Sequence, residues 1–338
     1  MRNLYVIVFV CVGSALLATL SVAQLRQSSG QGGAIWVERQ GPQLQIGQMG
    51  RGEVSVDLPP GATIRQIEPI SRGWMAAGRL PDADGTDLFL IAAGEGGAEL
   101  LPVPARGTAR YRGQPVLFLA DSELVGLAWA AGDGPREFAI WAAEWQEGEW
   151  SQPDLISPVG PGSQVAPAGA ILEDGSWLLA WTAYDGQDSE VVWSRRTESV
   201  WTAPEPIDGG NEVPDVTPDV VPIAGGAMAV WSWFDGNDYR LKSARWLNGD
   251  WRVTDAFGGR GSGEPRLFRE KDRILLLYPS VEPPCWTVVE FDLAGRRQRE
   301  ATVFKETYER PLLLVEEGEE GVLRWSTEDH ALEWRDTP

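Results

Sequence analysis

Reactive side chains are scarce in this sequence. Its 338 residues include 2 Cys and 1 His, and 29 Lys and Arg stand against 49 Asp and Glu. Cys11 lies in an apolar leader, so Cys285 alone cannot form a disulfide scaffold. One imidazole, His330, argues against His-based metal centres and His-dependent catalytic triads, and no cofactor is expected. A formal charge of −20 argues against nucleic acid as a partner, because phosphate binding needs clustered Lys and Arg.

Apolar and aromatic residues, by contrast, are plentiful. Hydrophobic residues make up 43% of the chain, and 17 of its residues are Trp. This content is enough to build a core, so the chain is not disordered. After about residue 34 no amphipathic helix is apparent, and short β-type runs are broken by Gly, Asp and Pro. The pattern predicts an all-β fold.

The first 23 residues have the composition of an export segment. Arg2 precedes an almost wholly apolar run, and Ser21-Val22-Ala23 fits a small-x-small cleavage site before Gln24. The alternative is an uncleaved anchor through residues 4–23, which are long enough to cross a bilayer. Residues 24–33 are polar and Gly-rich and are expected to form a flexible spacer. Residues 34–336 form the expected folded domain.

A repeat of about 50 residues organises this domain. Each copy begins with a Pro and an apolar strand, and in the five copies from Pro115 onward an aromatic residue follows 13 or 14 positions later. An acidic turn, a third strand and a short outer strand complete the copy. The repeat prolines are Pro69, Pro115, Pro167, Pro218, Pro265 and Pro311, and the first of these copies is the least regular.

Four strands in each repeat predict β-propeller blades. Six inner strands predict a six-bladed β-propeller of four-stranded antiparallel blades. The ring would close when strands from residues 34–58 join the last blade, which would remove exposed sheet edges. Seven blades are the alternative, if residues 34–58 form a blade of their own.

The recurring Trp residues and the acidic turns each allow a functional and a structural interpretation. Trp faces can stack on sugar rings, but recurrence in every blade favours packing between blades. Turns such as Asp235-Gly236-Asn237-Asp238 could offer oxygen ligands to Ca²⁺. Asp-Gly between apolar strands is also a hairpin signal, and we expect turns without metal.

The repeat resembles that of the bacterial sialidase-like six-bladed propellers, which carry an Asp box, Ser-x-Asp-x-Gly-x-x-Trp, between third and fourth strands. The segment from Ser194 to Trp201 has this length and keeps both ends. Arg196 and Glu198 stand where the box has Asp and Gly. The resemblance implies the fold more than the activity.

Residues just before the inner strands are expected to surround the mouth of the channel. The resemblance implies a glycosidase-like arrangement there, with Tyr308 as nucleophile, Glu264 as its base and Asp215 as acid/base. The expected ligand-binding residues are Arg65, Glu68, Arg112, Gln114, Gln164 and Arg310. The alternative for this polar set is a solvated rim.

These observations favour an exported, monomeric propeller that binds a glycan or an envelope protein without catalysis. An exo-glycosidase of the sialidase type is one alternative, and a structural envelope scaffold is the other. The expected location is periplasmic, extracellular or attached to the membrane through an uncleaved leader.

Overall fold

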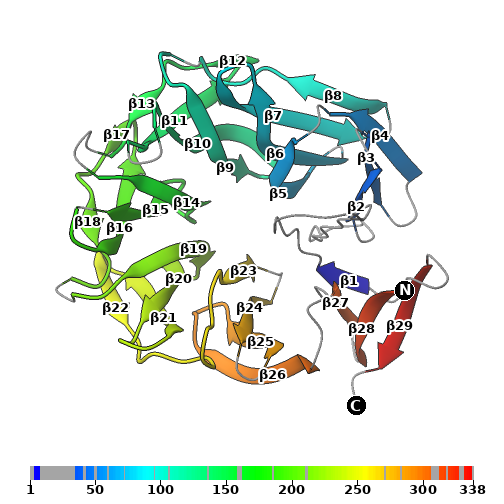
Figure 1. Ribbon diagram of the computed structural model, residues 1–338, viewed down its shortest axis with the longest axis vertical. Coiled ribbons are helices and arrows are strands. Elements are labelled where there is room, and N and C mark those ends of the chain that lie inside the picture. The colour runs from blue at the N-terminus through cyan, green and yellow to red at the C-terminus, as the bar shows by residue number, and fades with distance from the viewer. Residues whose placement is uncertain are drawn as a thin grey trace. The chain divides into compact units, whose positions relative to one another are not determined.

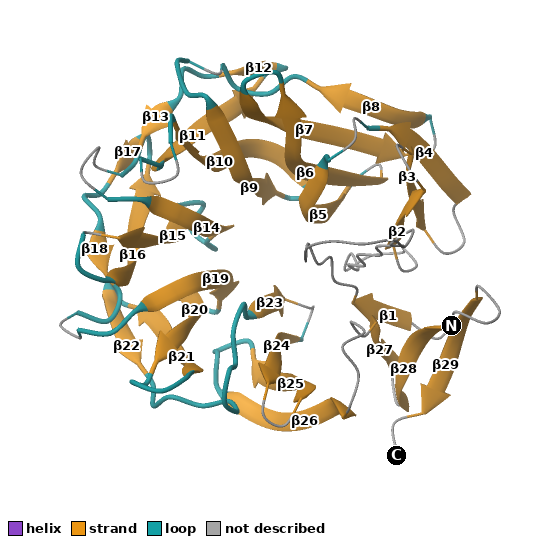
Figure 2. Ribbon diagram, in the orientation of Figure 1, coloured by secondary structure: helices purple, strands orange, loops and turns teal. Residues whose placement is uncertain are grey.

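The computed structural model confirms that the chain is all-β (Figures 1 and 2). In its described residues no helix is long and apolar enough to cross a membrane. The described residues are 4–7, 35–40, 43–48, 52–58, 61–71, 73–94, 96–105, 107–134, 137–157, 162–184, 186–209, 212–269, 272–281, 284–305, 312–316, 319–326 and 331–336.

The chain divides into two compact units. Unit 1 comprises residues 1–81, 89–102 and 306–338, and unit 2 comprises residues 82–88 and 103–305. Strands β6 (Gly73–Asp82) and β7 (Gly85–Gly94) each cross a boundary between these ranges. The other strands lie wholly in one unit.

Unit 2 holds four sheets that follow one another in chain order, each an antiparallel meander with short outer strands (Figure 1). The first is part of a nine-stranded sheet in which β9 also pairs with β7 in parallel. It contains β9 (Tyr111–Ala120), β10 (Glu123–Gly132), β11 (Ala139–Gln146), β12 (Glu149–Trp150) and β13 (Asp154–Leu155). The second contains β14 (Gln164–Ile171), β15 (Trp177–Tyr184), β16 (Ser189–Thr197), β17 (Val200–Trp201) and β18 (Glu205–Pro206). The third contains β19 (Asp215–Ile223), β20 (Gly226–Phe234), β21 (Tyr239–Leu247) and β22 (Asp250–Val253), and the fourth contains β23 (Arg266–Arg269), β24 (Arg273–Val281), β25 (Pro284–Asp292) and β26 (Arg297–Lys305).

Unit 1 contains two further sheets and a set of strands that pairs with β6 and β7. One sheet has the order β1 (Leu4–Ile7), β27 (Leu312–Glu316), β28 (Glu319–Ser326) and β29 (Ala331–Asp336). The second has the order β2 (Ile35–Gln40), β3 (Gln43–Gln48) and β4 (Gly52–Asp57). β5 (Thr63–Ile70) pairs with β6, and β8 (Gly97–Leu101) pairs with β7.

The N-terminal strands are not paired as the six-blade prediction requires. Residues 35–57 form their own sheet, which is the arrangement that the seven-blade alternative assumes. The last three strands form a sheet in which β27 pairs with β1 from the expected leader. The number of blades and the closure of a ring stay predictions.

Successive sheets of unit 2 pack face to face, which explains why their central strands are apolar on both faces. In β10 only the two ends and Val125 are more than slightly accessible. Separate apolar layers lie between the first and second, the second and third, and the third and fourth sheets. Sheets buried on both faces lose the usual alternation of apolar and polar residues.

The recurring Trp residues pack between these sheets. Trp129, Trp181 and Trp231 are fully buried at equivalent positions of the second strands. Outer-strand indoles cover the same layers, with Trp201 edge-on to Trp177 and Trp251 edge-on to Trp193. The packing interpretation is therefore confirmed for Trp129, Trp181 and Trp231, because a buried indole offers no face to a sugar.

The Ser194–Trp201 segment joins the third and fourth strands of its sheet, as the Asp-box resemblance predicts. Ser194 Oγ donates to the backbone oxygen of Thr202 at 2.8 Å, which fixes the outer strand. Glu198 takes a φ of 59° at the turn, where the box has Gly. The turn geometry is kept although the Gly is absent.

Candidate functional site

A repeated bulge marks the start of the inner strands in unit 2. The residue before each repeat Pro has a left-handed φ: 53° at Gln114, 52° at Ala166, 53° at Thr217 and 44° at Glu264. The pairing register shifts at the first three of these positions. Pro fits at a bulge because the ladder needs no N–H there.

The bulges are fastened to the preceding sheet by side chains. Gln114 Oε1 accepts the Ala166 N–H at 2.7 Å, and Thr182 Oγ1 accepts the Thr217 N–H at 2.9 Å. A buried backbone N–H needs such a partner when the ladder does not supply one. Gln114, expected to bind ligand, therefore uses its carbonyl oxygen to join two sheets.

Arg112 is also engaged inside the protein. Its side chain is only 1% exposed, and Nε donates to Asp87 Oδ1 at 2.6 Å while Nη1 donates to the Pro104 carbonyl at 2.6 Å. Thr86 Oγ1 donates to the Arg112 carbonyl at 2.8 Å, and Thr86 pairs with Tyr111. The guanidinium thus joins the start of β7 to β9, because a buried charge needs a paired and hydrogen-bonded setting.

Gln164 and Asp215 occupy equivalent places three residues before a repeat Pro, and each is the first residue of its inner strand. Gln164 Oε1 accepts the indole N–H of Trp181 at 2.7 Å. Asp215 is 1% exposed and lies opposite Trp233. Both polar side chains face the protein interior.

Two of the three expected catalytic side chains, Glu264 and Asp215, lie among the described residues. Glu264 is exposed whereas Asp215 is buried, so these two carboxylates do not share one solvent environment. Tyr308 and Arg310 lie outside the described residues.

Arg65 and Glu68 belong to unit 1. Arg65 is the extra residue at a bulge in β5, whereas Glu68 lies further along that strand, opposite Met75. Glu68 Oε1 accepts from Gln66 Nε2 at 2.7 Å. Because β5 begins at Thr63, Glu68 does not precede its inner strand as the repeat predicts.

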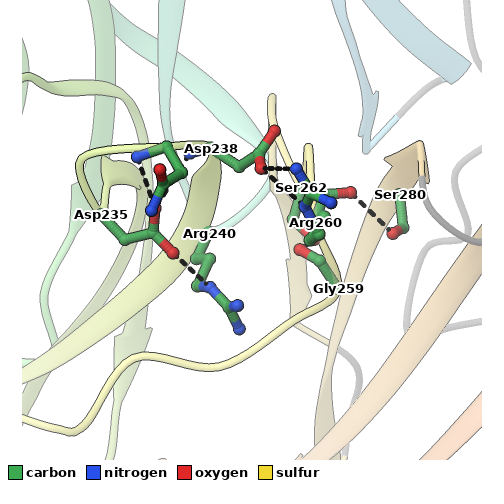
Figure 3. A network of polar contacts seen from close by, with 8 residues as sticks. Asp235, Asp238, Arg240, Gly259, Arg260, Ser262 and Ser280 are labelled. Atoms are coloured by element: carbon green, nitrogen blue, oxygen red, sulfur yellow. Dashed lines mark hydrogen bonds and ion pairs between the residues drawn. The ribbon is translucent and has the colours of Figure 1, made fainter.

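The structure reveals a cationic position that the sequence search did not select. Arg260 is 57% exposed, and its Nε donates to Asp238 Oδ2 at 2.7 Å (Figure 3). Its carbonyl accepts from Val281 N–H at 3.0 Å and from Ser280 Oγ at 3.1 Å. The backbone of Arg260 is therefore fixed, while its guanidinium reaches the acidic turn of the neighbouring sheet.

The residue after Asp238 and the residue whose N–H donates to the Arg260 carbonyl are both exposed. Tyr239 follows Asp238 directly and is 36% exposed, and Val281 is 68% exposed. We call Asp238, Tyr239, Arg260 and Val281 the Arg260 surface. Its sequence signal is the Gly-rich run 258–263, which lies just beyond the three positions searched before Pro265.

The acidic turn beside this surface is held by its own hydrogen bonds. Asp235 Oδ1 accepts the N–H groups of Asn237 and Asp238, both at 2.9 Å, and Asp235 Oδ2 accepts from Arg240 Nε at 2.7 Å. The two backbone N–H groups, with the guanidinium, lower the pKa of Asp235 to about 2. This geometry is that of an Asx turn, as the turn interpretation predicts.

Among the residues that the structure describes, no group of three or more His, Cys, Asp or Glu side chains is placed to hold a metal ion.

Comparison with known proteins identifies the type of fold. No family model and no curated protein matches the sequence. The Trypanosoma rangeli sialidase in complex with DANA has a TM-score of 0.53 at 10% identity, over 81% of this chain and 54% of its own. The chain has a propeller-type all-β fold.

Two other solved structures show the same likeness. A prolyl endopeptidase has a TM-score of 0.53 at 12% identity, over 98% of this chain and 46% of its own. A protein of unknown function from Dyadobacter fermentans has a TM-score of 0.52 at 14% identity, over 76% of this chain and 94% of its own. Identities this low establish the fold and leave the activity open.

Proposed function

We propose that this chain is an exported propeller-type module that binds a glycan or an envelope protein without catalysis, and that the Arg260 surface contacts the ligand. The observation that carries the proposal is the use of the expected ligand-binding side chains within the protein. Arg112, Gln114 and Gln164 donate to, or accept from, neighbouring strands. A substrate would have to replace buried bonds to reach them.

The Arg260 surface has a solvent-exposed cationic side chain, whereas Arg112, Gln114 and Gln164 are engaged within the protein. An exposed guanidinium donates to hydroxyl, carboxylate or carbonyl oxygens, and a partly exposed ring such as that of Tyr239 can pack on an apolar face. Because Asp238 already neutralises part of its charge, Arg260 suits a ligand rich in hydroxyl groups or an acidic protein side chain. Because one similar structure is a sialidase, a glycan is the first ligand to test.

Binding can be tested on a glycan array with the full-length exported protein. We expect reproducible hits that weaken at least tenfold in Arg260→Ala and in Tyr239→Ala. Arg252→Ala, an exposed Arg on outer strand β22, is the matched control and should keep the hits. Hits that persist unchanged in both test variants would remove the Arg260 surface from the proposal.

An envelope protein is distinguished from a glycan by crosslinking. With a photoreactive residue at Val281, we expect a specific protein adduct in intact cells if the array is silent. The adduct should disappear when Arg260→Ala is added. Silence in both experiments would contradict a binding function and favour the scaffold.

Catalysis is tested separately with a fluorogenic sialoside. We expect no release of the fluorophore above buffer. Release that is abolished by Tyr308→Phe and by Glu264→Gln would overturn the proposal in favour of the exo-glycosidase.

Export and attachment can be read from the mature N-terminus. Mass spectrometry should find a start at Gln24 if the leader is removed, or an intact leader if residues 4–23 anchor the chain. A chain that retains its leader and fractionates with the cytoplasm would contradict export.

A further inference from the structure

The indole of Trp231 presents a buried hydrogen-bond donor that the protein itself does not satisfy. Its side chain is 0% exposed, and its Nε1 has no hydrogen-bond partner among the described residues. Trp is a donor with no acceptor capacity, so this N–H can be satisfied only by an oxygen brought close to it. Buried donors without partners are uncommon and require a physical explanation.

The preceding sheet shows how the same position is satisfied elsewhere. Trp181 is the equivalent of Trp231, and its Nε1 donates to Gln164 Oε1 at 2.7 Å. Gln164 pairs with the residue two positions after Trp181, and Asp215 pairs with the residue two positions after Trp231. The register and the bulge are the same in both sheets, so Asp215 occupies the position in its sheet that Gln164 occupies in the preceding one.

The two side chains differ in length by one methylene group. The Gln164 amide reaches its indole, whereas no hydrogen bond joins Asp215 to Trp231. An acid shorter than the amide at this position has less reach toward the indole N–H. The Asp215 side chain is itself only 1% exposed.

We infer that Trp231 and Asp215 form a buried water-binding site. A water molecule accepts a hydrogen bond from the indole N–H and donates one to the Asp215 carboxylate, so the indole N–H gains the acceptor that it lacks. Buried waters take up such positions between polar groups. Both side chains are inaccessible from outside, so a larger hydroxylated ligand does not fit this role.

The inference is independent of the proposed function and is tested by crystallography of the full-length protein. In the wild type we expect an ordered water within about 3.2 Å of Trp231 Nε1 and of the Asp215 carboxylate. Asp215→Asn is the matched control, because Asn has the length of Asp and should keep the water. Asp215→Gln should expel it and accept the indole N–H directly, as Gln164 does.

Thermal unfolding gives an independent readout. Asp215→Gln is expected to raise Tm by about 2–4 °C relative to Asp215→Asn, the shift that one direct hydrogen bond gives in a domain of this size. The comparison of Gln with Asn holds the loss of charge constant, so only the reach of the amide differs.

The reciprocal variant protects the test against a failure of Asp215→Gln to fold. Gln164→Asn should lose the bond to Trp181 Nε1 and gain an ordered water there. A wild-type site without water, or a water that remains at Trp231 in Asp215→Gln, would overturn the inference.

Discussion

The single residues before the repeat prolines have an unusual backbone conformation. Four of them take a left-handed φ although none is Gly. Non-Gly residues adopt this conformation at a cost, so it persists only where the surroundings hold it. Each of the four is followed by a Pro that needs no ladder bond, and at Ala166 and Thr217 a side chain from the previous sheet accepts the N–H. The same positions that sequence patterns mark as a channel rim therefore serve as fasteners between sheets.

Gln114 provides a test of this role. Gln114→Ala removes the acceptor of the Ala166 N–H, and we expect a loss of about 1–3 kcal/mol in the free energy of unfolding, because a buried donor is left unsatisfied. Urea unfolding followed by Trp fluorescence measures it. Gln146→Ala, an exposed Gln at the end of β11, should change stability by less than about 0.5 kcal/mol. Equal effects of the two variants would show that the contact between sheets is unimportant.

At the scale of the element, the Asp235 turn joins β20 to β21 through its own side chain. The folded-state pKa of Asp235 lies at about 2, below its unfolded value of about 3.9. A lowered pKa means that the ionised form is favoured by folding. Its stabilisation is complete above the unfolded pKa and disappears as the pH falls through the folded one.

Asp235→Ala should therefore destabilise the protein at pH 6, and its difference from the wild type should shrink as the pH falls from about 4 toward 2. Urea unfolding at pH 6, 4 and 3 measures the trend. Arg240→Gln keeps the two backbone N–H donors, which are the main cause of the shift, and should have a smaller effect at pH 6. A difference that grows on acidification would contradict the assignment.

The layer between the first two sheets depends on glycines that make room for large rings. Phe118 and Trp177 stack with centroids 4.4 Å apart. A Cβ at Gly126 would overlap the Trp177 ring, and a Cβ at Gly169 would lie 2.7 Å from the Phe118 ring. These glycines are needed for close approach and not for turn geometry, since neither has a left-handed φ.

Gly126→Ala is accordingly expected to lower the free energy of unfolding by about 1–3 kcal/mol through overpacking. Gly134→Ala in the turn of the same sheet is the control, because the nearest atom to its Cβ is 3.8 Å away. Chemical denaturation of both variants measures the difference in their free energies of unfolding. If Gly126→Ala is as stable as Gly134→Ala, the layer has more freedom than its geometry indicates.

At the scale of the whole molecule, the net charge of −20 is the dominant electrostatic feature. Self-repulsion of a strongly charged chain opposes the compact state. Salt shortens the screening length from about 30 Å at 0.01 M to about 8 Å at 0.15 M. Tm should therefore rise over this range of NaCl, as measured by calorimetry. A fall in Tm would mean that ion pairs such as Lys242 with Asp208 outweigh the repulsion.

The fold type was accessible from the sequence because its signals are local and repeated. Pro, an aromatic residue and an Asp-Gly turn recur at fixed spacing, and each acts through nearby backbone. The site was less accessible, because burial and partners depend on neighbouring sheets. Gln114 and Gln164 have the composition of a binding rim, yet only contacts with the next sheet or the next strand show that their oxygens are occupied.

The sequence alone thus determined an all-β chain of repeated sheets with indoles between them, since periodicity and turn chemistry act over a few residues. Tertiary structure decided which polar side chains are exposed to solvent. It buried Arg112 and Asp215, left Arg260 exposed beside Asp238, and set Asp215 one methylene short of the arrangement that satisfies Trp181. The reason is physical: a side chain's accessibility is set by the sheet packed against it, which no local pattern encodes.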